Sequence, residues 1–108
     1  MKNDAQLAEL FAAFAHPTRI AVLRVLLSHC RTGRQFGDLA ADLGLSPSTL
    51  KHHLDEMQHA GVLRREVAGR ATILSLDLAA LSDAAAQLTR LCCSAQPTPQ
   101  PNHTEFDQ

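Results

Sequence analysis

A glycine turn between two short amphipathic segments constrains the fold of this chain more than any other feature. Apolar residues recur at helical spacing over residues 36–43 and stop at Gly44, as in a helix that ends at a glycine. Ser46 and Pro47 then provide a favoured N-cap and a favoured first position for a new helix. The inner face of that helix combines three apolar residues with one histidine: Leu50, His53, Leu54 and Met57. Two helices joined by so short a turn are typical of a helix-turn-helix, whose second helix enters a DNA major groove.

The flanking segments predict three more helices and a hairpin. Their periodicity indicates helices over residues 5–15 and 17–29, strands over residues 63–67 and 70–76 around an Ala68-Gly69 turn, and a last helix from about Asp77 to Cys92. We therefore expect a mainly α-helical chain with a β-hairpin wing. This is a winged helix-turn-helix with four helices, two strands and a final helix. The last helix repeats apolar residues every three or four positions, which is typical of a seam between two helices.

Length and composition limit the chain to one small domain. It has 108 residues, 45% of them hydrophobic, with no Trp or Tyr. We expect one domain over residues 1–95 and a disordered, proline-rich tail over residues 96–108. No apolar run approaches the roughly 18 residues that span a bilayer, so we expect no membrane partner and a cytoplasmic location. Nothing resembles a nucleophile with its base, paired catalytic carboxylates or a phosphate-binding glycine loop, so an enzyme is not expected.

Positive charge gathers in the middle of the chain although the whole chain has a net charge of -1. Residues 16–76 contain eight basic and five acidic side chains, an excess that suits contacts with phosphates. The predicted DNA-binding residues are those outside the apolar face of the fourth helix or on the hairpin: Ser46, Ser48, Thr49, Lys51, His52, Arg64, Arg65 and Arg70. Asp55 is also expected on the outer face. A merely solvated helix face is the alternative, and we interpret His53 as a hydrogen-bonded core residue.

Several stretches resemble the ArsR/SmtB family of winged-helix, metal-sensing repressors. The resemblance covers roughly residues 5–93 and is carried by FAHPTRI (14–20), DLA (38–40), LGLS (43–46), STLKHHL (48–54), AGVL (60–63) and REVAGR (65–70). It implies a homodimer through the first and last helices that reads an inverted repeat in double-stranded DNA and releases it when an inducer binds. The dimer contacts then expected are Leu7, Leu10, Phe11, Leu81 and Leu88.

The sensor sites of this family are only partly represented. Residues 32–41 contain no cysteine, and the last helix has no histidine, so two familiar metal sites are not expected. Cys92 and Cys93 resemble a subgroup that binds arsenic at the end of that helix. Soft thiolates favour trivalent arsenic or antimony, so we expect arsenite, methylarsenite or antimonite as inducer, with Cys30 as a candidate third ligand. Methylarsenite needs only two sulfur ligands, because its arsenic already carries one carbon.

Other interpretations of the same residues stay open. The adjacent cysteines could sense oxidants or persulfides, or Cys92 could simply fill the helix seam. His103 could join the pair in a zinc or cadmium site, although it stands in the tail predicted to be disordered. The winged helix could bind a protein instead of DNA, and Lys51, Arg64, Arg65 and Arg70 would then be replaceable. These alternatives differ in the salt dependence of DNA binding and in the inducer that relieves it.

Overall fold

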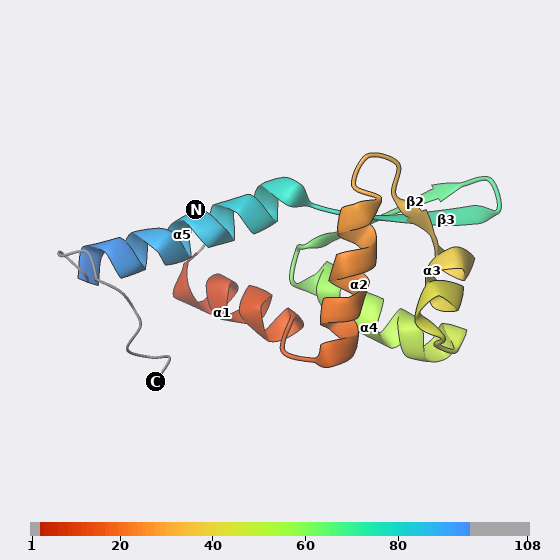
Figure 1. Ribbon diagram of the computed structural model, residues 1–108, viewed down its shortest axis with the longest axis horizontal. Coiled ribbons are helices and arrows are strands. Elements are labelled where there is room, and N and C mark those ends of the chain that lie inside the picture. Colours follow the sequence, from red (N-terminus) through yellow and green to blue (C-terminus); the bar gives the residue numbers. More distant parts are fainter. Residues whose placement is uncertain (1–2, 96–108) are drawn as a thin grey trace, which may run out of the picture.

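The computed structural model describes residues 3–95 and confirms the predicted mainly helical fold with a wing. In order, these residues form α1 (Asp4–Ala13), α2 (Pro17–Ser28), β1 (Arg34–Gln35), α3 (Phe36–Leu43), α4 (Pro47–His59), β2 (Leu63–Ala68), β3 (Ala71–Leu76) and α5 (Leu78–Ala95). The helix-turn-helix and the sheet form one end of the molecule, and α5 runs from the sheet toward the other end (Figure 1). The tail predicted over residues 96–108 lies outside the described residues.

The turn between α3 and α4 forms as its sequence predicts. Gly44 adopts the left-handed conformation, with φ 64° and ψ 35°, and its N–H group donates to the carbonyl groups of Ala40 and Ala41. Ser46 caps α4, since its hydroxyl oxygen accepts from the Thr49 N–H group at 3.3 Å. Glycine ends one helix and serine starts the next within three residues, which fixes the position of α4 relative to α3.

The first helix is shorter than predicted. It ends at Ala13 and not at Ala15, because the chain must extend at His16 to begin α2. His16 is the N-cap of α2, and its Nδ1 atom accepts from the Thr18 N–H group at 3.1 Å. A histidine therefore performs the role that serine performs for α4.

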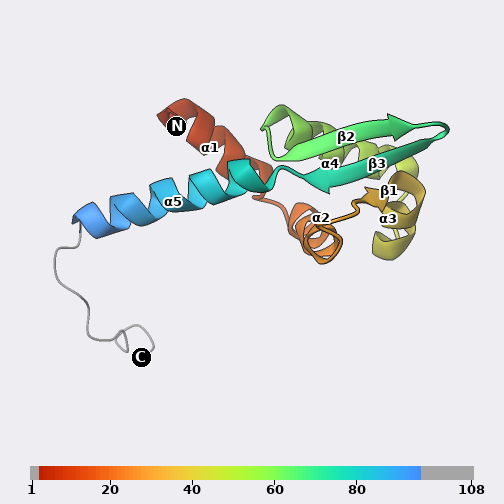
Figure 2. The same cartoon turned by 90° about the horizontal axis from the view of Figure 1, so that it is seen from above.

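The sheet has three antiparallel strands in the order β1-β3-β2, one more than the predicted hairpin. β2 and β3 pair from Leu63 with Leu76 to Ala68 with Ala71, so the two-residue turn is Gly69-Arg70 and not Ala68-Gly69. Gly69 has φ 64°, which suits the first position of such a turn. Seen from above, β2 and β3 lie across α4, with which β2 is in contact (Figure 2).

The short strand β1 attaches α3 to the sheet through a tight glycine. Gly33 precedes it with φ 75°, and a Cβ atom there would lie 2.7 Å from Ile73 Cγ2 and 2.9 Å from the Leu74 carbonyl oxygen. Glycine is therefore required both by the conformation and by the close approach of β3.

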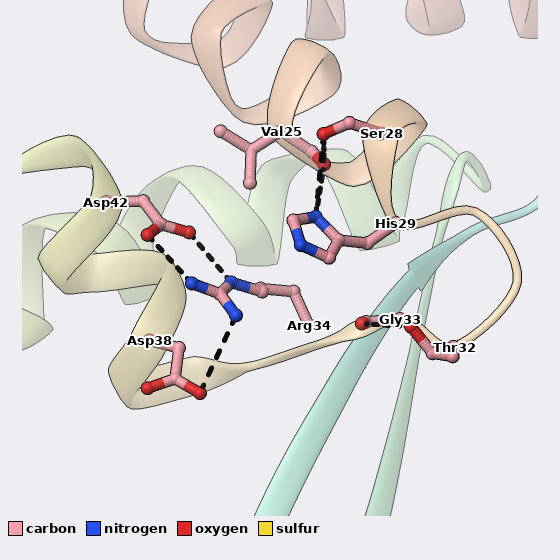
Figure 3. Close-up of polar contacts among 8 residues, drawn as sticks. All are labelled: Val25, Ser28, His29, Thr32, Gly33, Arg34, Asp38 and Asp42. Atoms are coloured by element: carbon pink, nitrogen blue, oxygen red, sulfur yellow. Dashed lines mark hydrogen bonds and ion pairs between the residues drawn. The ribbon is translucent and has the colours of Figure 1, made fainter.

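A forked ion pair then ties β1 to α3 (Figure 3). Arg34 donates from Nε and Nη2 to the two carboxylate oxygens of Asp42, at 2.8 and 2.9 Å, and Arg34 Nη1 lies 3.9 Å from Asp38 Oδ2. The hydrogen bonds from Arg34 lower the pKa of Asp42. In the same view, the Ser28 hydroxyl donates to the Val25 carbonyl group, and this bond finishes the last turn of α2.

Apolar side chains from all five helices and from β2 and β3 form the core. The largest fully buried ones are Leu10, Val22, Leu26, Leu39, Leu50, Leu54, Met57, Val62 and Leu74. Along α4, the buried residues are Leu50, His53, Leu54 and Met57, as predicted. No single helix within residues 3–95 has the length and apolar character to cross a membrane, and the one pair that qualifies jointly, α1 with α2, is bent by 89°.

The residues predicted at a dimer contact lie in two environments. Leu7 and Leu10 are buried in the core of their own chain, whereas Phe11 and Leu88 are 41% and 46% exposed. Leu81 packs against the core, next to the buried Ala84. Further along α5 at the same helical spacing, Leu88 and Leu91 continue this stripe where it is exposed.

Candidate nucleic-acid interface

The outer face of α4 is polar and open to solvent because its apolar residues are committed to the core. Ser48, Thr49, Lys51 and His52 are all exposed on the first two turns. Ser46 is exposed too, but its hydroxyl group also donates to Thr49 Oγ1 at 2.9 Å, so it serves the helix cap. The start of α4 thus presents hydroxyl, ammonium and imidazole groups, which can contact phosphates and base edges.

An acidic residue joins this face to the wing. Asp55 Oδ2 accepts from Lys51 Nζ at 3.0 Å, one helical turn away, and Asp55 Oδ1 accepts from Arg65 Nη2 at 3.0 Å. The hydrogen bonds from Lys51 and Arg65 lower the pKa of Asp55. The carboxylate therefore holds one cation of α4 and one cation of β2 side by side.

The three predicted wing arginines point in different directions. Arg65 shares its side of β2 with the buried Leu63 and meets α4, whereas Arg64 lies on the opposite side of the strand. Arg64 Nη2 is 3.4 Å from Asp77 Oδ1, at the start of α5. Arg70 is exposed in the turn at the tip of the wing. Lys51 and Arg65 are thus brought together, and Arg64 is kept apart from them.

A cavity of about 230 Å³ lies where α3, α4 and the wing meet, and Phe36, Lys51, Arg65 and Thr72 line it. Sequence reasoning had not assigned Phe36 or Thr72 to the site, and it had placed Asp55 outside without giving it a partner. The contact of Asp55 with Lys51 could have been predicted from the sequence, because residues four positions apart are neighbours on a helix. The contact of Asp55 with Arg65 is tertiary and has no local signal.

His53 is a core residue, as the sequence interpretation holds. It is 7% exposed, and its Nδ1 atom accepts from Arg19 Nε at 3.1 Å. Its ring also lies beside those of His16 and His52, with centroids 4.8 and 5.6 Å away. Burial lowers the pKa of His53, and the nearby charges of Arg19, His16 and His52 lower it further. A neutral His53 therefore links α4 to the start of α2.

The candidate thiols belong to two separate parts of the chain, the connection after α2 and the end of α5. Cys30 is exposed and lines a cavity of about 370 Å³ together with Arg64 and Leu78. Cys92 and Cys93 stand near the end of α5. Among the described residues, no three His, Cys, Asp or Glu side chains are grouped to hold a metal ion, and His103 lies outside them.

Comparison with known proteins identifies relatives of this chain. A family described as a helix-turn-helix domain matches residues 14–66. The HTH-type transcriptional regulator Rv0081 of Mycobacterium tuberculosis, itself uncharacterized, is 36% identical over 69 residues, which are 64% of this chain and 59% of that protein. The crystal structure of Rv0081 aligns at 32% identity over 84% of this chain and 92% of that chain, with a TM-score of 0.56.

Two further solved structures share the architecture. An ArsR-like transcriptional regulator from Rhodococcus sp. RHA1 aligns with a TM-score of 0.73 and 29% identity, over 83% of this chain and 82% of that chain. The homodimeric winged helix-turn-helix DNA-binding domain Mb0332 from Mycobacterium bovis aligns with a TM-score of 0.63 over 92% and 97% of the two chains. Its identity is 17%, so this second likeness concerns the fold.

Proposed function

Because the chain belongs to the HTH-type transcriptional regulators and is similar to an ArsR-like one, we propose that it is a repressor that binds double-stranded DNA as a homodimer. The observation that carries this proposal is the capped helix α4, whose inner face is committed to the core and whose polar outer face is exposed. Lys51 on that face is joined through Asp55 to Arg65 of the wing. Helix and wing thus offer one set of cations and hydroxyl groups for a duplex.

In this proposal the exposed residues divide into two roles. Ser48, Thr49 and His52 read base edges, since they lie at the start of the helix that enters the major groove. Lys51, Arg65 and Arg70 contact phosphates, which positions the protein without conferring sequence preference. Arg64 faces Asp77 on the other side of the wing, so we assign it a lesser part in DNA binding.

The proposed dimer forms through the terminal helices. Support comes from the apolar stripe of α5, in which Leu88 and Leu91 are 46% and 60% exposed beyond the point where α5 leaves the core. Phe11 adds exposed apolar surface on α1. A second copy of the chain would cover these side chains, and the Mb0332 domain of the same fold is homodimeric. Two copies present two α4 helices to an inverted repeat whose half-sites are about 34 Å apart.

For the inducer, we propose a trivalent arsenical or antimonite bound by the thiolates of Cys92 and Cys93. The support is chemical, because adjacent thiolates suit soft, thiophilic centres. In this proposal Cys30, a small thiol or water would complete the three-ligand set that inorganic arsenite prefers. A ligand at the end of the dimer helix would rotate the protomers and change the spacing of the two α4 helices.

Fluorescence anisotropy on a duplex from the chain's own upstream promoter tests the DNA proposal. Thr49→Ala should reduce the preference for that duplex over a scrambled one, whereas Arg70→Ala should weaken binding to both equally. Arg31→Ala removes the same charge on the α2–β1 connection and should change neither affinity. If the wild-type chain binds no duplex, or if all three variants bind like it, a protein-binding module becomes the better account.

The same assay tests the inducer proposal. Addition of arsenite, methylarsenite or antimonite to the reduced protein should release the duplex, and the Cys92→Ser/Cys93→Ser variant should stay bound. Cys30→Ser tests the candidate third ligand, and this variant should still respond to methylarsenite, which needs only two sulfurs. Release by a persulfide donor alone would assign redox sensing to the pair, and release of the double variant by an arsenical would place the inducer site elsewhere.

A further inference from the structure

Asp55 occupies a position that the proposed DNA-binding role of α4 does not explain. It lies on the same exposed surface as the residues assigned to DNA, where a negative charge repels phosphates. Yet its two carboxylate oxygens accept one hydrogen bond each, from Lys51 Nζ and from Arg65 Nη2, both at 3.0 Å. The two cations that best suit a phosphate are therefore already neutralised in part by the protein itself.

The surroundings of this trio provide room for an anion. Lys51 and Arg65 line the cavity of about 230 Å³ whose other walls are Phe36 and Thr72. The side chains of Lys51, Asp55 and Arg65 are 64%, 45% and 25% exposed, so solvent and ligands can reach the trio. A phosphate oxygen in this cavity would present to Lys51 and Arg65 the same kind of acceptor that Asp55 now presents.

We propose that this cavity receives a backbone phosphate of double-stranded DNA, and that Asp55 lowers DNA affinity by competing with that phosphate for Lys51 and Arg65. The inference rests on the proposed DNA-binding function and adds a residue that limits it. In the free protein the carboxylate holds both cations, and in the complex the phosphate replaces it. Without Asp55 the trio would carry two positive charges, where it now carries one.

The competition makes no distinction between DNA sequences. Phosphate contacts carry no sequence information, so removal of the carboxylate should strengthen binding to a promoter duplex and to a scrambled duplex by the same factor. The expected factor is on the order of ten, because two exposed ion pairs no longer have to be broken on binding. The slope of log affinity against log salt should stay the same, because the chain contacts the same phosphate with or without Asp55.

The test uses the full chain with Asp55→Asn, which keeps the size of the side chain and one acceptor oxygen. Affinity for both duplexes is measured over a salt series, and thermal unfolding of each variant is followed alongside. Asp55→Ser is the second variant, which removes the carboxylate with a different side chain. Both variants should bind both duplexes more tightly than the wild-type chain.

Two controls separate competition from a general charge effect. Asp38→Asn removes the same charge from α3, where Asp38 faces Arg34, and should tighten binding much less. In a Lys51→Gln/Arg65→Gln background, Asp55→Asn should lose its effect, because the cations it competes for are gone.

Two results would overturn the inference. Weaker binding of Asp55→Asn and Asp55→Ser would mean that Asp55 positions the two cations for DNA, and tightening equal to that of Asp38→Asn would mean that only net charge matters. Either result overturns the inference while the DNA-binding function stands. If the wild-type chain binds neither duplex, the function and the inference fall together.

Discussion

At the scale of single residues, the buried, neutral imidazole of His53 joins α4 to α2. Its Nδ1 atom accepts from Arg19, and its neighbours Arg19, His16 and His52 all disfavour a positive charge on it. The pKa of His53 is therefore lowered from the ordinary value of 6.5. Protonation would cost both the hydrogen bond and the solvation of a buried cation.

This shift predicts a loss of stability in acid. Below about pH 6.5 the unfolded chain protonates His53 while the folded chain does not, so the free energy of unfolding falls until the lowered pKa of the folded state is reached. Urea unfolding of the wild-type chain from about pH 7.5 to about pH 5 should show this fall. His53→Asn should be less stable at the upper pH but lose less on acidification, whereas His52→Asn, which removes only the smallest of these causes, should stay close to the wild type. If the free energy of unfolding fell equally with pH for the wild type and His53→Asn, the lowered pKa of His53 would be contradicted.

Two glycines offer a matched test of the junction between α2 and the sheet. Gly33 has φ 75° and no room for a Cβ atom, whereas a Cβ atom at Gly37, inside α3, would meet nothing within 4 Å. Gly33→Ala should lower the free energy of unfolding by at least about 1 kcal/mol, because alanine is strained in this conformation. Gly37→Ala should raise it by roughly 0.5–1 kcal/mol, since alanine is the better helix former. Thermal or urea unfolding of both variants measures the difference, and equal effects would contradict the account of this junction.

At the scale of elements, sequence reasoning succeeds where the signal is local. The cap at Ser46, the end of α3 at Gly44 and the apolar face of α4 are each determined within a few residues, and all three were predicted. The strand β1 was not predicted, because two residues show no alternation and their pairing with β3 is between distant parts of the chain. The same limit applies to Asp55 and Arg65, whose contact depends on where β2 lies against α4.

The exposed Leu88 and Leu91 on α5 predict that the chain forms a dimer. Replacement of both leucines by lysine should raise the dimer dissociation constant. The expected increase is at least about tenfold for each leucine that the interface buries. Analytical ultracentrifugation should then show monomer, with an unchanged far-ultraviolet circular dichroism spectrum. Val67→Lys changes an equally apolar side chain, 73% exposed on the wing, and should leave the dimer intact. A wild-type chain that sediments as a monomer at all concentrations would contradict the proposed dimer.

At the scale of the whole molecule, the proposed function depends on an uneven distribution of charge. The chain has a net charge of -1, so binding to DNA cannot come from its total charge. In the proposed function, DNA binding depends on Lys51 and Arg65 where α4 meets the wing, and on Arg70 at the wing tip. Arg34, by contrast, is held by Asp42 and Asp38 between β1 and α3, so its charge serves the fold.

The salt dependence of DNA binding tests this account most directly. The logarithm of the association constant for the promoter duplex should fall linearly with the logarithm of the salt concentration. Each phosphate contacted should add about 0.9 to the magnitude of the slope. Lys51→Ala and Arg70→Ala should each reduce the slope by about 1, and Arg31→Ala should leave it unchanged. An affinity that does not depend on salt, or a slope that Arg31→Ala reduces as much as Lys51→Ala does, would contradict the assignment of α4 and the wing to DNA.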